Sequence, residues 1–207
     1  EDKGADDPDH IRADLAELQA RIARTQDANR QAKIDKRHNL GYRTARENIA
    51  DICDAGSFIE YGQMTVAAQR QRRELDDLID NTPADGLVAG FGSINGDMFD
   101  EDASRAAVLA YDYTVLAGTQ GLFNHKKTDR VLEIATEWQA PMVFYTEGGG
   151  GRPGDTDAGK ISRGGPDVMT FATWANATGS PQHPALHNGS CISGNPAPFR
   201  PPQAITP

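Results

Sequence analysis

Four consecutive glycines and an arginine follow an apolar run in residues 144–155, which read FYTEGGGGRPGD. Glycine adopts backbone angles that other residues avoid, and it lets a ligand contact the main chain. Successive amides in such a loop can form an anion-binding concavity, and a neighbouring arginine adds a planar cation suited to phosphate or carboxylate. A flexible surface loop is the alternative interpretation. The residues concerned are Gly148, Gly149, Gly150, Gly151 and Arg152.

A second glycine-containing segment, NGSCISGN at residues 188–195, also follows an apolar stretch. If a helix begins near Asn195, the amides of Gly194 and Asn195 would point to one spot, and paired donors of this kind stabilise a developing oxyanion. A plain turn is the alternative. Pro196 and Pro198 are compatible with a first helical turn, but they argue against a longer helix.

A third segment, NHKKTDR, places three basic residues within about one helical turn. They are Lys126, Lys127 and Arg130. A cluster of this kind could attract nucleotide phosphates. A solvated helix face without a ligand is the alternative interpretation.

Other reactive residue types do not form a recognisable site. His183, His187 and Cys191 are spaced four apart, but a proline and a glycine interrupt a helical presentation, so we expect no bound metal. Ser190 does not lie in a Gly-x-Ser-x-Gly elbow, which argues against a hydrolase triad. The glycine run matches neither the Walker loop nor the dinucleotide fingerprint.

Composition limits the classes of function. The length of 207 residues predicts one domain or one large half-domain. The net charge of −9 argues against non-specific binding to nucleic acid. Cys53 and Cys191 cannot form a disulfide framework, and the apolar flanks of Cys53 predict a core position. No apolar run reaches about 18 residues and no leader pattern opens the chain, so we expect a cytoplasmic protein that does not bind membranes.

Hydrophobic periodicity in the first third of the chain predicts helices. Ile11, Leu15, Leu18 and Ile22 form one apolar stripe, with Asp9 as a plausible cap. A second helix fits residues 44–53, and Gly56 is expected to end it. Residues 63–84 are predicted to form a loop and a short helix.

The remaining sequence alternates between strands and helices. Residues 87–91 are predicted to form a buried strand that turns at Asn95-Gly96, and residues 106–110 another that residues 113–116 could extend. A helix over 122–139 and a third strand over 140–146 follow, and the helix face is predicted to contain Val131, Ile134, Ala135 and Trp138. Less regular sequence predicts a helix over 167–176, a fourth strand from 184–187 and an irregular proline-rich tail. The class is α/β or α+β, with ligands expected at strand ends.

Five segments in this order resemble the N-terminal half of the carboxyltransferase component of biotin-dependent acyl-CoA carboxylases. Within that family the closest resemblance is to the single-chain, long-chain acyl-CoA carboxylase branch. The resemblance runs from about Arg30 to Asn195. The segments are TARENIADICDAGSFIEYG, GLVAGFGSINGD, YDYTVLAGTQGLFNHKKTDR, PMVFYTEGGGGRPGDTD and NGSCISGN.

The resemblance implies a crotonase-like α/β fold, a superhelix of ββα units. It divides the chain into a helical extension (1–56), a truncated carboxyltransferase domain (57–195) and a tail (196–207). It implies that carboxybiotin, carried on another domain or subunit, delivers CO2 to the α-carbon of an acyl-CoA through an enolate held by backbone amides. Carried over by position, Gly194 and Asn195 would hold the thioester oxygen, the glycine run and Arg152 would shape the acyl-CoA channel, and the basic cluster would lie near the coenzyme A phosphates.

The implied partners are acyl-CoA, the biotin carboxylase and carrier components, a C-terminal carboxyltransferase half and further copies of the chain in a homo-oligomer. Past Asn195 the sequence departs from the family, because PAPFRPP replaces an apolar helix. We therefore expect a truncated product or fragment that does not complete turnover alone. Two alternatives stay open: an enoyl-CoA hydratase or isomerase using Glu147, and a non-catalytic remnant that binds carboxylase subunits.

Overall fold

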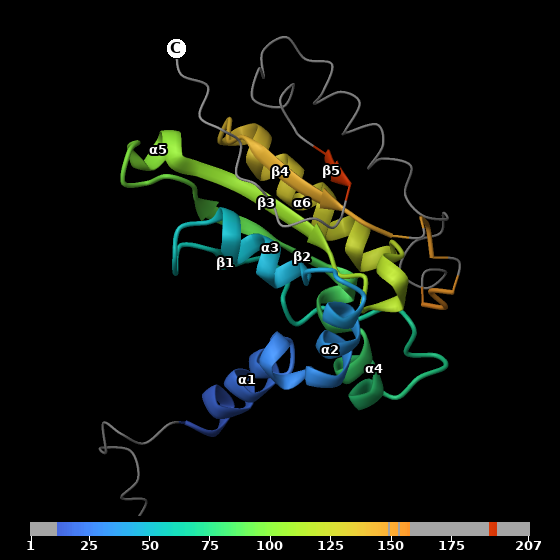
Figure 1. Ribbon diagram of the computed structural model, residues 1–207. Coiled ribbons are helices and arrows are strands. Elements are labelled where there is room, and N and C mark those ends of the chain that lie inside the picture. The colour runs from blue at the N-terminus through green and yellow to red at the C-terminus, as the bar shows by residue number, and fades with distance from the viewer. Residues whose placement is uncertain (1–11, 149, 153, 158–190, 194–207) are drawn as a thin grey trace, which may run out of the picture.

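The computed structural model describes residues 12–148, 150–152, 154–157 and 191–193. Their centre is a twisted five-stranded sheet in the order β1-β2-β3-β4-β5 (Figure 1). The first two pairings, β1–β2 and β2–β3, are antiparallel, whereas β3–β4 and β4–β5 are parallel. The strands are β1 (Ile59–Glu60), β2 (Leu87–Ser93), β3 (Arg105–Tyr111), β4 (Met142–Thr146) and β5 (Cys191–Ser193).

The described residues form six α-helices. Helices α3 and α6 pack on opposite faces of the sheet, and α6 forms the crossover between the parallel strands β3 and β4 (Figure 1). The helices are α1 (Ala13–Ala23), α2 (Gln31–Asn39), α3 (Ala45–Ile52), α4 (Leu75–Asn81), α5 (Glu101–Ser104) and α6 (Leu122–Glu137). Short 3-10 turns are η1 (Asp27–Asn29), η2 (Pro83–Gly86) and η3 (Leu116–Gly118).

The central strands are buried on both faces, as is typical of strands covered by helices on each side. Successive side chains alternate between the two faces, so each strand contributes to two apolar clusters. The cluster under α6 contains Leu87, Ala89, Ala107, Leu109, Val131, Leu132, Ala135, Met142 and Phe144. The cluster under α3 contains Ala45, Ile49, Cys53, Val88, Ala106, Val108, Ala110 and Tyr145.

Helix α3 begins with a reciprocal capping box. The amide of Glu47 donates to Thr44 Oγ1 at 3.0 Å, and the Glu47 carboxylate accepts from the amide of Thr44 at 2.7 Å. This arrangement satisfies two amides that a helix start would otherwise leave unpaired. The sequence TARE carries the same signal, and the helix predicted over 44–53 is confirmed.

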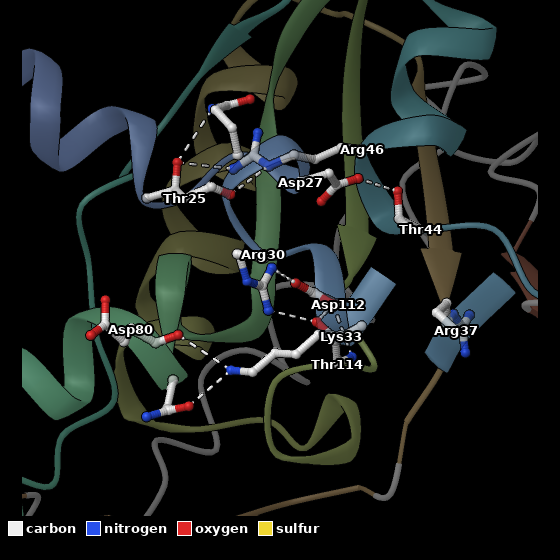
Figure 2. A network of polar contacts seen from close by, with 12 residues as sticks. Thr25, Asp27, Arg30, Lys33, Arg37, Thr44, Arg46, Asp80, Asp112 and Thr114 are labelled. Atoms are coloured by element: carbon white, nitrogen blue, oxygen red, sulfur yellow. Dashed lines mark hydrogen bonds and ion pairs between the residues drawn. The ribbon is translucent and has the colours of Figure 1, made fainter. Parts of the chain in front are cut away.

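A buried polar network joins the N-terminal helices to the sheet (Figure 2). Arg30 donates to the Asp112 carboxylate at 2.8 Å and to Thr114 Oγ1 at 2.6 Å, just past the end of β3. The two side chains of the ion pair are only 5% and 10% exposed. In the same network the Thr44 hydroxyl donates to Asp27. The segment before α3 is therefore fixed to the carboxyl end of the sheet.

Three details of the predicted strands and helices are wrong or need amendment. Residues 113–116 do not extend β3, because the Asp112 carboxylate accepts from the amide and hydroxyl of Thr114 and starts a turn. Asn95-Gly96 does turn, with a positive φ of 58° at Asn95, but a longer connection containing α5 joins β2 to β3. Trp138, predicted on the same face as Val131, is 49% exposed and packs on Phe91 with 4.9 Å between the ring centroids.

Several other predictions are confirmed, and some concern residues that the structure does not describe. The strands over 87–91, 106–110 and 140–146, the helix over 122–139 and the core position of Cys53 are confirmed. Helix α1 forms, but its stripe is open, with Leu15 43% and Leu18 38% exposed. The apolar cluster under α3 contains residues from both sides of position 56, and the division of the chain at that position stays a prediction. The cap at Asp9, the helix at 167–176, the strand at 184–187 and the tail lie outside the described residues.

Candidate functional site

A cavity of about 330 Å³ lies where β3 and β4 end and α6 begins. In open α/β sheets this edge, at the carboxyl ends of parallel strands, is the usual place for a ligand. Glycine backbone, one acidic side chain, one imidazole, hydroxyls and two aromatic rings share the lining. The residues are Tyr111, Gly118, Gln120, His125, Thr128, Phe144, Thr146, Glu147, Gly148 and Gly150.

Two glycines in this lining touch through their backbones. A Cβ atom on Gly148 would lie 2.1 Å from the carbonyl oxygen of Gly118, and one on Gly118 would lie 2.3 Å from that of Glu147. Gly118 also has a φ of +64°, a conformation that other residues adopt only with strain. At Gly118 and Gly148 the cavity wall is bare main chain, because a side chain at either position would overlap the opposite backbone.

Arg152 faces inward, where it fixes the glycine segment. Its guanidinium pairs with the fully buried Asp85 at 2.5 Å, donates to the carbonyl of Thr119 at 2.7 Å and reaches Asp155 at 3.4 Å. Its own amide donates to Gln120 O at 2.8 Å, and the Gln120 amide donates to Gly150 O at 2.8 Å. The cation that the sequence offers to a phosphate is therefore already engaged by buried carboxylates.

The same carboxylates occupy the amino end of α6. Asp155 accepts from the amide of Leu122 at 2.8 Å, and Asp85 accepts from that of Asn124 at 2.9 Å. These amides are donors that a helix start leaves free for an anion. Burial raises the pKa of Asp85, while the charge of Arg152 opposes that rise. The helix start is thus neutralised from within the protein.

His125 and Thr128 line the cavity from the first turns of α6. His125 is 8% exposed, and burial lowers its pKa, so the imidazole is neutral at pH 7. A neutral imidazole offers one donor and one acceptor to a ligand. The sequence does not indicate a role for either residue, although both lie in NHKKTDR. The functional interpretation of that segment rests on its basic side chains alone.

The three basic residues of NHKKTDR do not form one cluster. Lys126 and Arg130 are exposed, and Arg130 pairs with Glu133 at 3.1 Å. Lys127 is buried, and its ammonium donates to the carbonyls of Ala84, at 3.0 Å, and Leu87. A role of Lys126, Lys127 and Arg130 near coenzyme A phosphates stays a prediction, and geometry leaves Lys126 and Arg130 as the accessible pair.

The burial of Lys127 predicts a pH-dependent stability. Burial lowers the pKa of Lys127 from 10.5 to about 8. Between these values the unfolded chain binds a proton that the folded protein has lost, so the free energy of unfolding rises with pH. In the wild type we expect the free energy of unfolding to rise by up to about 3 kcal/mol between pH 8 and pH 10. The Lys127→Met variant should lack this increase.

Urea unfolding of the wild type and of Lys127→Met at matched pH values measures this difference. The comparison cancels other groups, such as Cys53, whose pKa burial raises to about 11. A stability difference between the two proteins that stays constant from pH 7 to pH 10 would contradict the prediction.

Two glycine-containing segments follow neighbouring strands. β4 and β5 pair in parallel with Thr146 opposite Ser193, so the strands end side by side. Gly148 and Gly150 are exposed at the end of β4, and Gly151 forms a parallel bridge to Gln120. Gly149, Gly194 and Asn195 lie outside the described residues. Their predicted roles in substrate and oxyanion binding stay predictions.

The sheet, its crossover helix and the cavity at the strand ends define a crotonase-like α/β protein. The chain belongs to the carboxyl transferase domain family, whose family model matches residues 36–179. The resemblance drawn from the five sequence segments is therefore confirmed.

Three comparisons illustrate this relationship. A single-chain, multi-domain long-chain acyl-CoA carboxylase is 54% identical in sequence, and its structure superposes with a TM-score of 0.73 over 81% of this chain and 16% of that chain. The transcarboxylase 12S structure with methylmalonyl-CoA bound is 26% identical, with a TM-score of 0.56 over 80% of this chain and 28% of that one. The propionyl-CoA carboxylase beta chain of Saccharopolyspora erythraea is 31% identical over 138 residues, which cover 67% of this chain and 23% of the relative.

The chain spans about a quarter of the length of the curated relatives that it matches. None of the helices in the described part of the chain combines the length and apolar character needed to cross a bilayer.

Proposed function

We propose that this chain is the N-terminal part of an acyl-CoA carboxyltransferase of the biotin-dependent carboxylases. The intact enzyme would move CO2 from carboxybiotin to the α-carbon of an acyl-CoA. The observation that carries the proposal is the family match over residues 36–179, together with 54% identity to a long-chain acyl-CoA carboxylase of the same fold. Cytoplasmic location is part of the proposal.

The described residues suit a reaction that passes through an enolate. Such a reaction needs preorganised donors for a developing negative charge, and main-chain amides supply them without a nucleophile. Gly148 and Gly150 expose backbone at the cavity, and a larger residue at Gly148 would overlap the backbone of Gly118. Biotin would supply the carboxyl group from another domain.

The two glycine-containing segments and the exposed basic residues would bind different parts of the acyl-CoA. Gly148–Gly151 and Arg152 would shape the acyl-CoA channel, and Gly194 with Asn195 would hold the thioester oxygen. The pairing of Thr146 with Ser193 supports this assignment, because the strands that precede the two segments end side by side. Lys126 and Arg130 would attract the coenzyme A phosphates.

The partners are proposed on the same basis. They are a C-terminal carboxyltransferase half, a biotin carboxylase with its carrier, and further copies of the chain, since the transcarboxylase 12S structure is described as a hexamer assembly. Glu147 gives little support to the hydratase alternative, because Arg37 binds its carboxylate through both oxygens.

Calorimetric titration of the folded 207-residue chain with acetyl-CoA, propionyl-CoA and a long-chain acyl-CoA tests the proposal. We expect saturable binding of at least one thioester, with free coenzyme A binding more weakly because it lacks the acyl group. Circular dichroism of the same sample establishes that the chain is folded. Absence of heat for every thioester in such a sample would overturn the proposed function.

A further inference from the structure

Arg37 on α2 meets Glu147, the residue that directly precedes the glycine segment, across 110 positions of sequence. One guanidinium nitrogen donates to Glu147 Oε1 at 2.7 Å, and the other donates to Oε2. The third nitrogen, Nε, donates to the carbonyl of Arg43 at 2.9 Å. All three guanidinium nitrogens therefore have a partner. The contact with Glu147 is bidentate, a geometry that adds orientational specificity to the ion pair.

The surroundings hold this guanidinium still. Its carbon lies 4.7 Å from the ring centroid of Tyr42 and 5.4 Å from that of Tyr113. The Arg37 side chain is 8% exposed and that of Glu147 is 19% exposed, so solvent screens their attraction only weakly. Figure 2 shows Arg37 on α2, apart from the cluster formed by Arg30, Asp112 and Thr114.

The position of Glu147 determines the position of the neighbouring cavity wall, because its backbone is in contact with Gly118. The carbonyl oxygen of Glu147 lies so close to Gly118 that a Cβ there would approach it to 2.3 Å. Gly148 makes the reciprocal backbone contact, and Gln120 and Arg152 continue the pairing of the two segments through main-chain hydrogen bonds. A shift of Glu147 would therefore move the whole glycine-lined wall.

We propose that Arg37 is a positioning residue: through Glu147 it sets the conformation of the glycine segment and so the binding of acyl-CoA. The N-terminal helices would then belong to the substrate site, although α2 contributes no residue to the cavity lining. The second half of this inference rests on the proposed function.

Native-state hydrogen exchange at the amides of Gln120 and Arg152 measures how firmly the glycine segment is held, and it needs no ligand. Arg37→Met is compared with Arg46→Met, a matched control, because Arg46 also binds a buried glutamate, Glu60, through two nitrogens and donates to a backbone carbonyl. We expect Arg37→Met to accelerate exchange at these two amides by about tenfold more than Arg46→Met does. Equal acceleration in the two variants would overturn the proposal.

Titration with propionyl-CoA provides the second readout. We expect about tenfold weaker binding in Arg37→Met and in Glu147→Gln, no further loss in the double variant, and wild-type affinity in Arg46→Met. Unchanged affinity in Arg37→Met would overturn the link to binding. If the wild type binds no thioester, the proposed function and this link both fail, while the exchange result still decides whether Arg37 sets the segment.

Discussion

Asp85→Asn is expected to lower the free energy of unfolding by about 3–5 kcal/mol, the usual cost of removing one partner from a buried ion pair. Asp85 is completely buried, and its carboxylate serves both Arg152 and the amide of Asn124. Asparagine has nearly the same shape as aspartate and tolerates the positive φ of 48° at this position. The loss of stability therefore measures the contribution of the negative charge. Arg152 would keep Asp155 as a more distant carboxylate, at 3.4 Å.

Urea unfolding of Asp85→Asn, with Glu133→Gln as the control, measures this effect. Glu133 also pairs with an arginine, but the two side chains are 52% and 60% exposed, so its loss should cost less than about 1 kcal/mol. A cost at Asp85 no larger than that at Glu133 would mean that the buried charges do not stabilise the fold.

The sequence predicts the three central strands and the crossover helix well, since each of these elements has a local pattern. It does not predict β1, and β5 lies within NGSCISGN, where the sequence indicates a turn or a helix start. Val88 and Leu109 lie in apolar runs that glycine or charge interrupts, and Val131 and Ala135 repeat at helical spacing. These are properties of a few neighbouring residues. The position of the glycine segment follows from the same signals, because it directly ends a strand.

The partners of the charged residues could not be predicted in the same way. Arg152 reads in sequence as a free cation beside glycines, yet its partner Asp85 lies 67 positions earlier. Lys127 resembles its neighbour Lys126 in type, but its ammonium turns inward to a backbone carbonyl 43 positions away. Local sequence specifies which charges exist, whereas the fold decides which of them become buried together.

The Asx turn at Asp112 illustrates the same limit at shorter range. The segment after β3 continues with residues that favour strands, and this composition predicts an extension. The Asp112 carboxylate instead accepts from Thr114 and from Arg30, which arrives from 82 positions earlier. A distant cation thus helps to fix a local turn, and no local pattern contains that information.

Gly148→Ala is expected to deform the cavity wall and to weaken propionyl-CoA binding by about tenfold or more. The added methyl group would lie 2.1 Å from the carbonyl oxygen of Gly118, so the backbone of one segment must move. Overpacking of this kind also destabilises a fold by about 1–3 kcal/mol. Calorimetric titration and urea unfolding of the variant measure the two effects.

Gly151→Ala is the matched control for this substitution. A Cβ on Gly151 meets nothing within 4 Å, and its φ lies outside the left-handed region, so alanine should be accommodated with little change in stability. If both variants retain wild-type affinity, the glycine segment does not shape the ligand site. If only Gly148→Ala loses affinity, close contact between Gly118 and Gly148 is what the site requires, rather than general flexibility of a glycine-rich loop. The distinction matters because flexibility would predict comparable losses at every glycine in the run, whereas a backbone contact predicts a loss only where a side chain has no room.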